Sequence, residues 1–190
     1  MDAIAGDVCA AGSRCRRCCR GGYTLVELMV VLALLAIILA LAMPGFTELI
    51  ERQKISAATA DLLAAIRLTR AEAIRRGQRV DLVPADGADW RSGWIIFIDD
   101  NDNRRMDAGE AIILVHDAVA RGIAINSALT DRSATYLAYV ASGRTRTNAN
   151  SQTPQLGHLS LSLGVQQRRI IINFLGRARA CNPLVEAACG

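Results

Sequence analysis

Six arginines near the C-terminal end are the residues of this chain best able to bind a ligand by charge. They are Arg144, Arg146, Arg168, Arg169, Arg177 and Arg179. Residues 140–190 contain only one acidic residue, Glu186. Two of them fall in the run Gly176-Arg177-Ala178-Arg179. Arginines two residues apart can reach adjacent phosphates, because a guanidinium forks onto phosphate oxygens and glycine lets the backbone come close. The pattern predicts salt-sensitive contact with a polyanion, with a solvated basic face as the alternative.

An acidic stretch raises the question of a calcium loop. Its carboxylate and amide residues fall at positions 1, 3, 5, 9 and 12 of an EF-hand loop, and they are Asp99, Asn101, Asn103, Asp107 and Glu110. Position 6 of such a loop should be glycine and is Arg104 here, and the flanking segments have strand patterns rather than helical ones. We therefore interpret the stretch as a turn rich in Asn and Asp, with calcium binding as the alternative.

Patterns for catalysis are absent from the sequence. His116 and His158 are the only histidines, and neither has a cysteine or serine neighbour with a nucleophile signature. The chain has no glycine-rich phosphate loop and no dinucleotide fingerprint. We predict that the protein is not an enzyme and needs no cofactor, and that both histidines are surface or strand residues.

Cysteines are confined to the two ends of the chain. Four precede the apolar segment described below, namely Cys9, Cys15, Cys18 and Cys19. They do not predict a metal site, because zinc needs four ligands at set spacings and no histidine is near. Cys181 and Cys189 can form a disulfide if the body of the protein is exported, since disulfides persist in oxidising compartments.

The N-terminal region combines a basic cluster, a glycine pair and an apolar run. Residues 28–43 carry no charge, and residues 23–43 would form about 31 Å of helix, close to the thickness of a hydrocarbon core. A plain membrane anchor fits this run, and so does a signal peptide cut after Ala40-Leu41-Ala42. Neither explains Glu27 at its head, because a carboxylate near lipid is costly without a partner.

The run Gly22-Tyr23-Thr24-Leu25-Val26-Glu27 resembles the prepilin cleavage motif of type IV pilins and type II secretion pseudopilins. Only Tyr23 departs from it, at a position where phenylalanine is commoner. The resemblance implies that a prepilin peptidase removes residues 1–22 as a leader, cutting between Gly22 and Tyr23, and methylates the new N-terminus. It implies that Glu27 pairs with the terminal amine of a neighbouring subunit during filament assembly. It also implies a single-pass inner-membrane protein with a periplasmic head, later part of a cell-surface pilus in a Gram-negative-type bacterium.

One long helix and a β-rich head are expected to position these residues. Residues 23–45 should form the transmembrane and filament-core helix, with Met43-Pro44-Gly45 as a kink or a melting point. Residues 46–190 should contain the second half of the helix and the head. This half should begin near Phe46, end at Arg76 and bury one face, which consists of Ile55, Leu62, Ile66 and Ala73, widened by Leu63 and Ile74. Strands are expected at 78–83, 93–98, 111–115, 122–127, 135–140, 159–163 and 168–174, with a polar loop at 145–157.

The head narrows the resemblance to one group. Arg70-Ala71-Glu72-Ala73-Ile74-Arg75-Arg76-Gly77 with Val80, and Gly93-Trp94-Ile95-Ile96-Phe97 with Asp99 and Asn101, resemble the FimT/GspH group of minor pilins and pseudopilins. The run at 176–179 is similar to the Gly-Arg-x-Arg motif of FimT-type minor pilins, which bind DNA during natural transformation.

This resemblance implies an α+β type IV pilin fold, with a long N-terminal helix and a globular head packed on its second half. It implies other pilins as partners, and non-specific binding of double-stranded DNA. The DNA-binding residues would be Gly176, Arg177, Arg179, Arg144, Arg146, Arg168 and Arg169. The alternative is a type II secretion pseudopilin, or an assembly-priming minor pilin, that does not bind DNA.

Overall fold

The computed structural model describes residues 23–189, apart from the side chains of residues 41–45. The chain divides into two units, Met1–Met43 and Pro44–Gly190, and each is described by itself. The predicted leader with its cleavage residue Gly22 lies outside the described residues, as do Cys9, Cys15, Cys18 and Cys19.

Capping residues define both ends of helix α1 (Leu25–Arg76). At its start the backbone N–H of Glu27 donates to Oγ1 of Thr24 at 3.2 Å, which satisfies one of the free donors of the first turn. The Glu27 carboxylate lies in the same turn, where the helix dipole favours negative charge. At the other end Gly77 adopts φ +71° and its N–H donates to the carbonyl oxygen of Ala73. Glycine takes this left-handed conformation without strain, so the helix ends where the sequence predicts.

The apolar part of α1 is exposed in the isolated chain, from Leu25 to Leu39. The helix continues through Pro44 and Gly45, so the predicted melting at this point is wrong. Proline at this position removes one backbone donor, and the remaining hydrogen bonds of the helix keep the segment helical. Within the described residues, no helix has a stretch long and apolar enough to cross a membrane. The predicted span includes residues 41–43, whose side chains are not described, and it stays a prediction.

In the unit Pro44–Gly190 the second half of α1 buries one face. Ile55, Leu62, Ile66 and Ala73 are fully buried, which confirms the predicted stripe. Burying each of the three large side chains contributes roughly 1.5–3 kcal/mol. Leu63 packs against this core as predicted, but Ile74 is 51% exposed and does not widen the stripe. Ile74 directly follows Ala73 and therefore points about 100° away from it around the helix.

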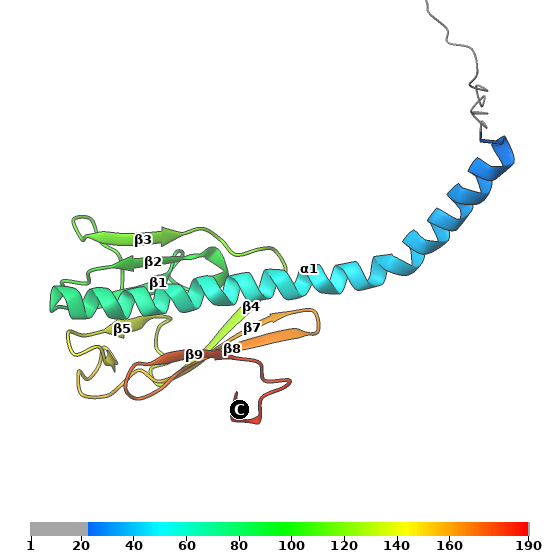
Figure 1. The fold of residues 1–190 in the computed structure, drawn as a ribbon. Helices are drawn as coiled ribbons and strands as arrows, with labels where there is room; N and C mark the ends of the chain where they lie inside the picture. The colour runs from blue at the N-terminus through cyan, green and yellow to red at the C-terminus, as the bar shows by residue number, and fades with distance from the viewer. Residues whose placement is uncertain (1–22, 190) are drawn as a thin grey trace, which may run out of the picture. The chain divides into compact units, whose positions relative to one another are not determined.

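Two antiparallel sheets complete this unit (Figure 1). The first has the order β3-β2-β1-β5-β6 and consists of β1 (Val80–Pro84), β2 (Trp94–Phe97), β3 (Ile112–His116), β5 (Leu137–Tyr139) and β6 (Thr145–Arg146). The second has the order β4-β7-β8-β9 and consists of β4 (Ala124–Leu129), β7 (Gly157–Leu163), β8 (Gln166–Ile172) and β9 (Ala178–Cys181). Short 3-10 turns lie at η1 (Trp90–Ser92) and η2 (Ala187–Cys189). One core cluster joins α1 to both sheets, through residues such as Ile66, Leu82 and Ile170.

All seven predicted strands are present, with ends that differ from the prediction by up to two residues. Two strands were not predicted. β6 lies in the stretch 145–157, which was expected to be a polar loop, and Thr147 and Gln155 of that stretch are buried. The side-chain Oε1 of Gln155 accepts a hydrogen bond from the N–H of Asp131 at 2.8 Å, so the polar composition reflects buried hydrogen bonding rather than exposure. β9 contains the second arginine of the 176–179 run.

Candidate nucleic-acid interface

The first arginine of the 176–179 run lies in the turn between β8 and β9, which Asn173 organises. The side-chain Oδ1 of Asn173 accepts hydrogen bonds from the N–H groups of Leu175 and Arg177, at 3.0 and 2.9 Å. The backbone carbonyl of Asn173 accepts a hydrogen bond from the N–H of Gly176 at 2.9 Å. The backbone N–H of Asn173 donates to the carbonyl of Arg177 at 3.1 Å. An asparagine that holds its own turn in this way fixes the direction in which the Arg177 side chain leaves the backbone.

Gly176 is required at its position for two reasons. Its φ of +74° is a conformation that residues with a Cβ rarely adopt. A Cβ there would also lie 2.7 Å from the carbonyl oxygen of Gly143 and 3.2 Å from the nitrogen of Thr145. The turn at 173–177 is therefore seated directly against the turn that joins β5 to β6, and the hydroxyl of Tyr139 donates to the Gly176 carbonyl at 2.8 Å.

These two turns bring Arg144 and Arg177 to one end of the head. Arg144 follows Gly143 in the β5–β6 turn, and Arg177 follows Gly176 in the β8–β9 turn. Both side chains are exposed, and neither guanidinium has a hydrogen bond or ion pair with any residue in the described part of the chain. Phe174, in the same turn as Arg177, is 57% exposed. Sequence reasoning placed Phe174 in a strand, but β8 ends at Ile172.

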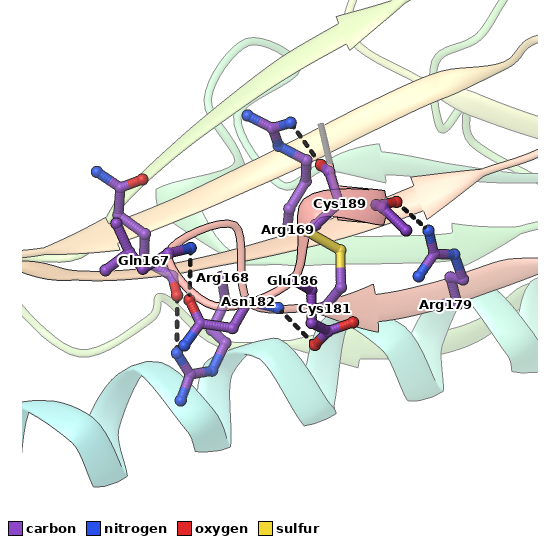
Figure 2. Close-up of a disulfide and its surroundings, with 10 residues drawn as sticks. Gln167, Arg168, Arg169, Arg179, Cys181, Asn182, Glu186 and Cys189 are labelled. Carbon is purple, nitrogen blue, oxygen red and sulfur yellow. Dashed lines mark hydrogen bonds between the residues drawn. A yellow bond between two sulfur atoms is a disulfide. The ribbon is translucent and has the colours of Figure 1, made fainter.

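Arg169 and Arg179 are instead directed at the C-terminal tail, which the predicted disulfide between Cys181 and Cys189 holds in place (Figure 2). Nη1 of Arg169 donates to the Cys189 carbonyl at 2.7 Å, and Nη2 of Arg179 donates to the Ala188 carbonyl. The disulfide prediction is confirmed. The pairing leaves Arg179 exposed at the surface but with part of its donor capacity occupied by the tail.

The remaining two predicted arginines lie apart from the 173–177 turn. Arg168 lies near the other end of β8, where Nη1 donates to the Gln167 carbonyl and the side chain borders a hollow that also contains Glu186. Arg146 is mostly buried, and its Nη1 lies 3.5 Å from Oδ2 of Asp102. The structure thus groups Arg144 with Arg177, places Arg179 beside the tail, and uses Arg146 inside the head.

Sequence reasoning overlooked two arginines of α1. A hollow of about 210 Å³ separates the helix from the β8–β9 turn, and its lining residues are Ile66, Arg67, Arg70, Tyr139, Gly176, Arg177 and Ala178. Arg67 and Arg70 are three residues apart and therefore lie on the same side of the helix. That spacing next to the buried Ile66 was the available signal, but nothing in the sequence indicates that the C-terminal turn packs over this part of α1.

The acidic turn between β2 and β3 lies against a positive charge of the protein itself, the buried guanidinium of Arg79, which precedes β1. Its Nη2 lies 2.6 Å from Oδ2 of Asp81 and 3.1 Å from Oδ2 of Asp99. Its Nη1 lies 2.6 Å from Oδ1 of Asp102 and 2.8 Å from Oδ1 of Asn148. A buried charge with hydrogen bonds on both amino groups avoids the cost of an unpaired ion.

The other oxygens of this turn accept hydrogen bonds from nearby N–H groups. Oδ2 of Asp107 accepts from the side-chain amides of Asn101 and Asn103. Both oxygens of Glu110 accept from backbone N–H groups, at Asp100 and Asp107. No group of His, Cys, Asp and Glu side chains in the described part of the chain is arranged to hold a metal ion. The interpretation as an Asn- and Asp-rich turn fits these contacts.

Three carboxylates around Arg79 leave surplus negative charge at this site. Burial raises the pKa of Asp81 to about 7 against the lowering effect of Arg79, and the neighbouring Asp99 adds to the rise. Burial alone would lower the pKa of Arg79, but its hydrogen bond and proximity to Asp81 raise it instead. Arg79 therefore stays charged, while Asp81 takes up a proton near neutral pH.

Both histidines lie in strands, as expected. His116 ends β3 and stacks on Trp94 with ring centroids 4.0 Å apart. His158 lies in β7, where burial and the charge of Arg169 lower its pKa.

Comparison with known proteins assigns the chain to a family. Residues 58–176 match the family described as type II transport protein GspH, and residues 17–43 match the prokaryotic N-terminal methylation motif. The pilin-like protein PilA1 of Thermus thermophilus is 39% identical over 98 residues, which are 51% of this chain and 60% of that protein. The chain thus spans less than two thirds of the length of this relative.

The fold is also found in a solved pilin. Two crystal structures of the type IV minor pilin FimU of Pseudomonas aeruginosa have TM-scores of 0.51 and 0.50 at 18% and 16% identity. The matched regions cover 68% and 66% of this chain, and 89% and 91% of the two FimU chains. The GspH match spans more than half of the chain and the fold is that of a type IV pilin. The chain therefore belongs to the GspH family, as a type IV pilin-like protein of the minor pilin or pseudopilin kind, and carries a prokaryotic N-terminal methylation motif.

Proposed function

We propose that this protein is a minor pilin of a type IV pilus that binds extracellular double-stranded DNA without sequence preference, for uptake in natural transformation. The observation that carries the proposal is that Arg144 and Arg177 lie on adjacent turns at the same end of the head. Two interlocked turns hold their backbones close together, and neither guanidinium has a partner among residues 23–189. Arginine keeps its charge at any relevant pH and can fork onto phosphate oxygens.

The other arginines of the C-terminal region support this role to different degrees. Arg179 is exposed but shares its donors with the tail carbonyl of Ala188. Arg168 and Arg169 add positive charge along β8, which raises the local concentration of a polyanion without requiring direct contact. Arg146 contributes through the Asp102 pair, which fixes the strand that follows Arg144.

A DNA-binding assay on the full chain in non-ionic detergent tests the proposal. The parent should bind duplex DNA with a dissociation constant on the order of 10⁻⁴ to 10⁻⁶ M. The slope of log affinity against log salt should become less steep by about 0.9 for each phosphate contact removed. Arg144→Gln and Arg177→Gln should each produce this change.

Arg121→Gln is the matched control. Arg121 is an exposed arginine that precedes β4. The start of β4 pairs with the end of β7 that lies farthest from the 173–177 turn. This variant removes the same charge from the opposite end of the sheet, so it should leave the slope unchanged. If the slope of log affinity against log salt were the same for all three variants and the parent, Arg144 and Arg177 would not be the DNA site.

The alternative function is a type II secretion pseudopilin, or an assembly-priming minor pilin, without a DNA role. The description of the matching family, a type II transport protein, favours this alternative. Absence of DNA binding by the parent even at low salt would select it.

At the N-terminus we propose cleavage between Gly22 and Tyr23 by a prepilin peptidase in the inner membrane. The methylation-motif match at residues 17–43 supports this proposal. The exposed Glu27 would then meet the terminal amine of a neighbouring subunit. N-terminal mass analysis of the membrane fraction should find a methylated N-terminus at Tyr23. An N-terminus at Met43 would instead identify a conventional signal peptide.

A further inference from the structure

We infer that the hollow between α1 and the β8–β9 turn is a binding site for one phosphate group, formed by Arg67 and Arg70 of the helix and Arg177 of the turn. The inference rests on the proposed function, because it adds two helical residues to the DNA-binding surface. It predicts that the backbone of a bound duplex crosses the helix as well as the two turns.

The size of the hollow suits a small anion. Its volume is about 210 Å³, which is below the roughly 300–1,000 Å³ of pockets that enclose drug-sized ligands. The floor is apolar or already hydrogen-bonded, since Ile66 is buried and the Tyr139 hydroxyl is engaged by the Gly176 carbonyl. The donors left to face an occupant are therefore the guanidinium groups.

The charge around the hollow is uncompensated. Three arginines line it and no carboxylate does. The nearest acid along the helix on the C-terminal side is Glu72, which is already paired with Arg75 at 2.6 Å and Arg76 at 2.7 Å. Three cations without a counter-ion at one site repel one another, and an anion placed between them removes that repulsion.

Arg70 supplies the most specific indication. Its Nε is buried but has no hydrogen-bond partner in the described part of the chain. Buried N–H groups are nearly always hydrogen-bonded. The Nε groups of Arg104 and Arg169 also lack a partner, but of these three arginines only Arg70 lines the hollow. Ion pairing explains the other helical arginines in this region, Arg75 and Arg76, but it does not explain Arg70.

A glycine outside the lining of the hollow packs closely against the Arg70 side chain. A Cβ at Gly143 would lie 3.1 Å from Nε of Arg70 and 2.7 Å from Cδ1 of Ile74. A side chain at position 143 would therefore press on the Arg70 guanidinium. Gly143 also has φ +72°, so a side chain is excluded by backbone conformation as well.

A phosphate group matches this arrangement better than a carboxylate does. It presents oxygens in several directions, and guanidinium groups from two different elements can bind them together. The group could come from a phosphodiester of DNA or from free phosphate, and the two sources need separate experiments. The phosphodiester is favoured because Arg144 lies on the adjacent turn and would contact the same backbone.

The first experiment uses inorganic phosphate as the probe, with the full chain in detergent. Arginine Nε–H signals are followed by NMR while phosphate is added at constant ionic strength. The Arg70 and Arg177 signals should shift in the parent, and the shift should be lost in Arg67→Gln. Arg75→Gln, an exposed arginine of the same helix outside the hollow, should behave as the parent. Absence of any Arg70 shift would overturn the inference.

The second experiment measures DNA affinity at several salt concentrations. Arg67→Gln should make the salt slope less steep by about 0.9, and Arg75→Gln should not. Arg70→Lys keeps the charge and removes the fork, so it should weaken binding at every salt concentration without changing the fold. If the parent binds DNA and Arg67→Gln binds equally well, the phosphodiester assignment fails while the proposed function stands. If the parent binds no DNA, the proposed function fails, and a phosphate-induced shift of Arg70 would identify a site for free phosphate.

Discussion

The phenolic hydroxyl of Tyr139 donates a hydrogen bond to the carbonyl oxygen of Gly176 across 2.8 Å. Tyr139 belongs to the sheet that contains β5, and Gly176 precedes β9 in the other sheet. Burial raises the pKa of Tyr139, so the hydroxyl remains a donor throughout the neutral range. The contact fixes the turn that carries Arg177 against the part of the head that carries Arg144.

Substitution of Gly176 should therefore cost both stability and DNA binding. Gly176→Ala imposes a left-handed conformation, which costs roughly 1–2 kcal/mol. The added Cβ would also overlap the Gly143 carbonyl, which adds roughly 1–3 kcal/mol. Denaturant unfolding followed by the fluorescence of the buried Trp90 and Trp94 would measure the loss.

Gly87→Ala is the matched control for this prediction. Gly87 has φ +77°, but a Cβ there has no atom within 4 Å. This variant should show only the conformational part of the cost and should bind DNA as the parent does. Equal stability of the two variants would mean that the close approach of the two turns has no energetic consequence.

Removal of the disulfide should lower the stability of the head. Cys181 and Cys189 close a loop with a sequence separation of 8. In the chain-entropy model such a loop stabilises by about 2–3 kcal/mol. The double variant Cys181→Ser, Cys189→Ser should lose this amount in denaturant unfolding. Thiol counting on the unreduced parent should find neither of these two thiols free.

The disulfide should also limit how far Arg179 contributes to DNA binding. Arg179→Gln in the parent should change the salt slope less than Arg177→Gln does, because Arg179 donates to the Ala188 carbonyl. In the double serine variant the tail is released, so Arg179→Gln should then make the slope less steep by about 0.9. An equal effect of Arg179→Gln in both backgrounds would contradict the role given to the tail.

The stability of the head should fall as pH rises from about 5 to 7. The folded pKa of Asp81 is about 7, above the roughly 3.9 of an unfolded aspartate, so the folded state binds more protons in this window. Its stabilising contribution is complete below pH 4 and is lost as pH rises through 7. Thermal unfolding of the parent and Asp81→Asn at pH 5.5 and 8 would isolate this effect.

His158 acts in the opposite sense and needs its own control. Its lowered pKa means that the folded state binds fewer protons than the unfolded state near pH 6, which favours higher pH. The comparison should therefore be repeated in a His158→Gln background. A parent whose unfolding temperature is the same at both pH values in this background would refute the assignment to Asp81.

The parts of the fold that have a regular pattern were predictable from the sequence. The stripe from Ile55 to Ala73 repeats with the helical period, and Gly77 marks the end of the helix. Strand β6 was missed because its two residues are too few to form a pattern. Strand β9 was missed because Arg179 within it, and Arg177 just before it, make the segment resemble an exposed turn. The cysteine pair was predictable because only two cysteines follow the helix.

The site was less predictable, because it depends on contacts between distant segments. Charge counting treated all six C-terminal arginines alike, whereas packing directs Arg146 to Asp102 and Arg179 to the tail. Arg70 precedes Arg177 by more than a hundred residues, and only the tertiary fold brings both to one hollow. No local rule could have connected them.

The Arg79 network has a consequence for how the acidic turn responds to dissolved ions. A loop ordered by a dissolved ion loses its order when the ion is scarce, because occupancy follows concentration. Arg79 is covalently part of the chain and cannot be diluted or chelated, so the turn from Asp99 to Glu110 keeps its shape whatever the mineral content of the medium. The shape of this turn is therefore independent of the ionic composition of the medium.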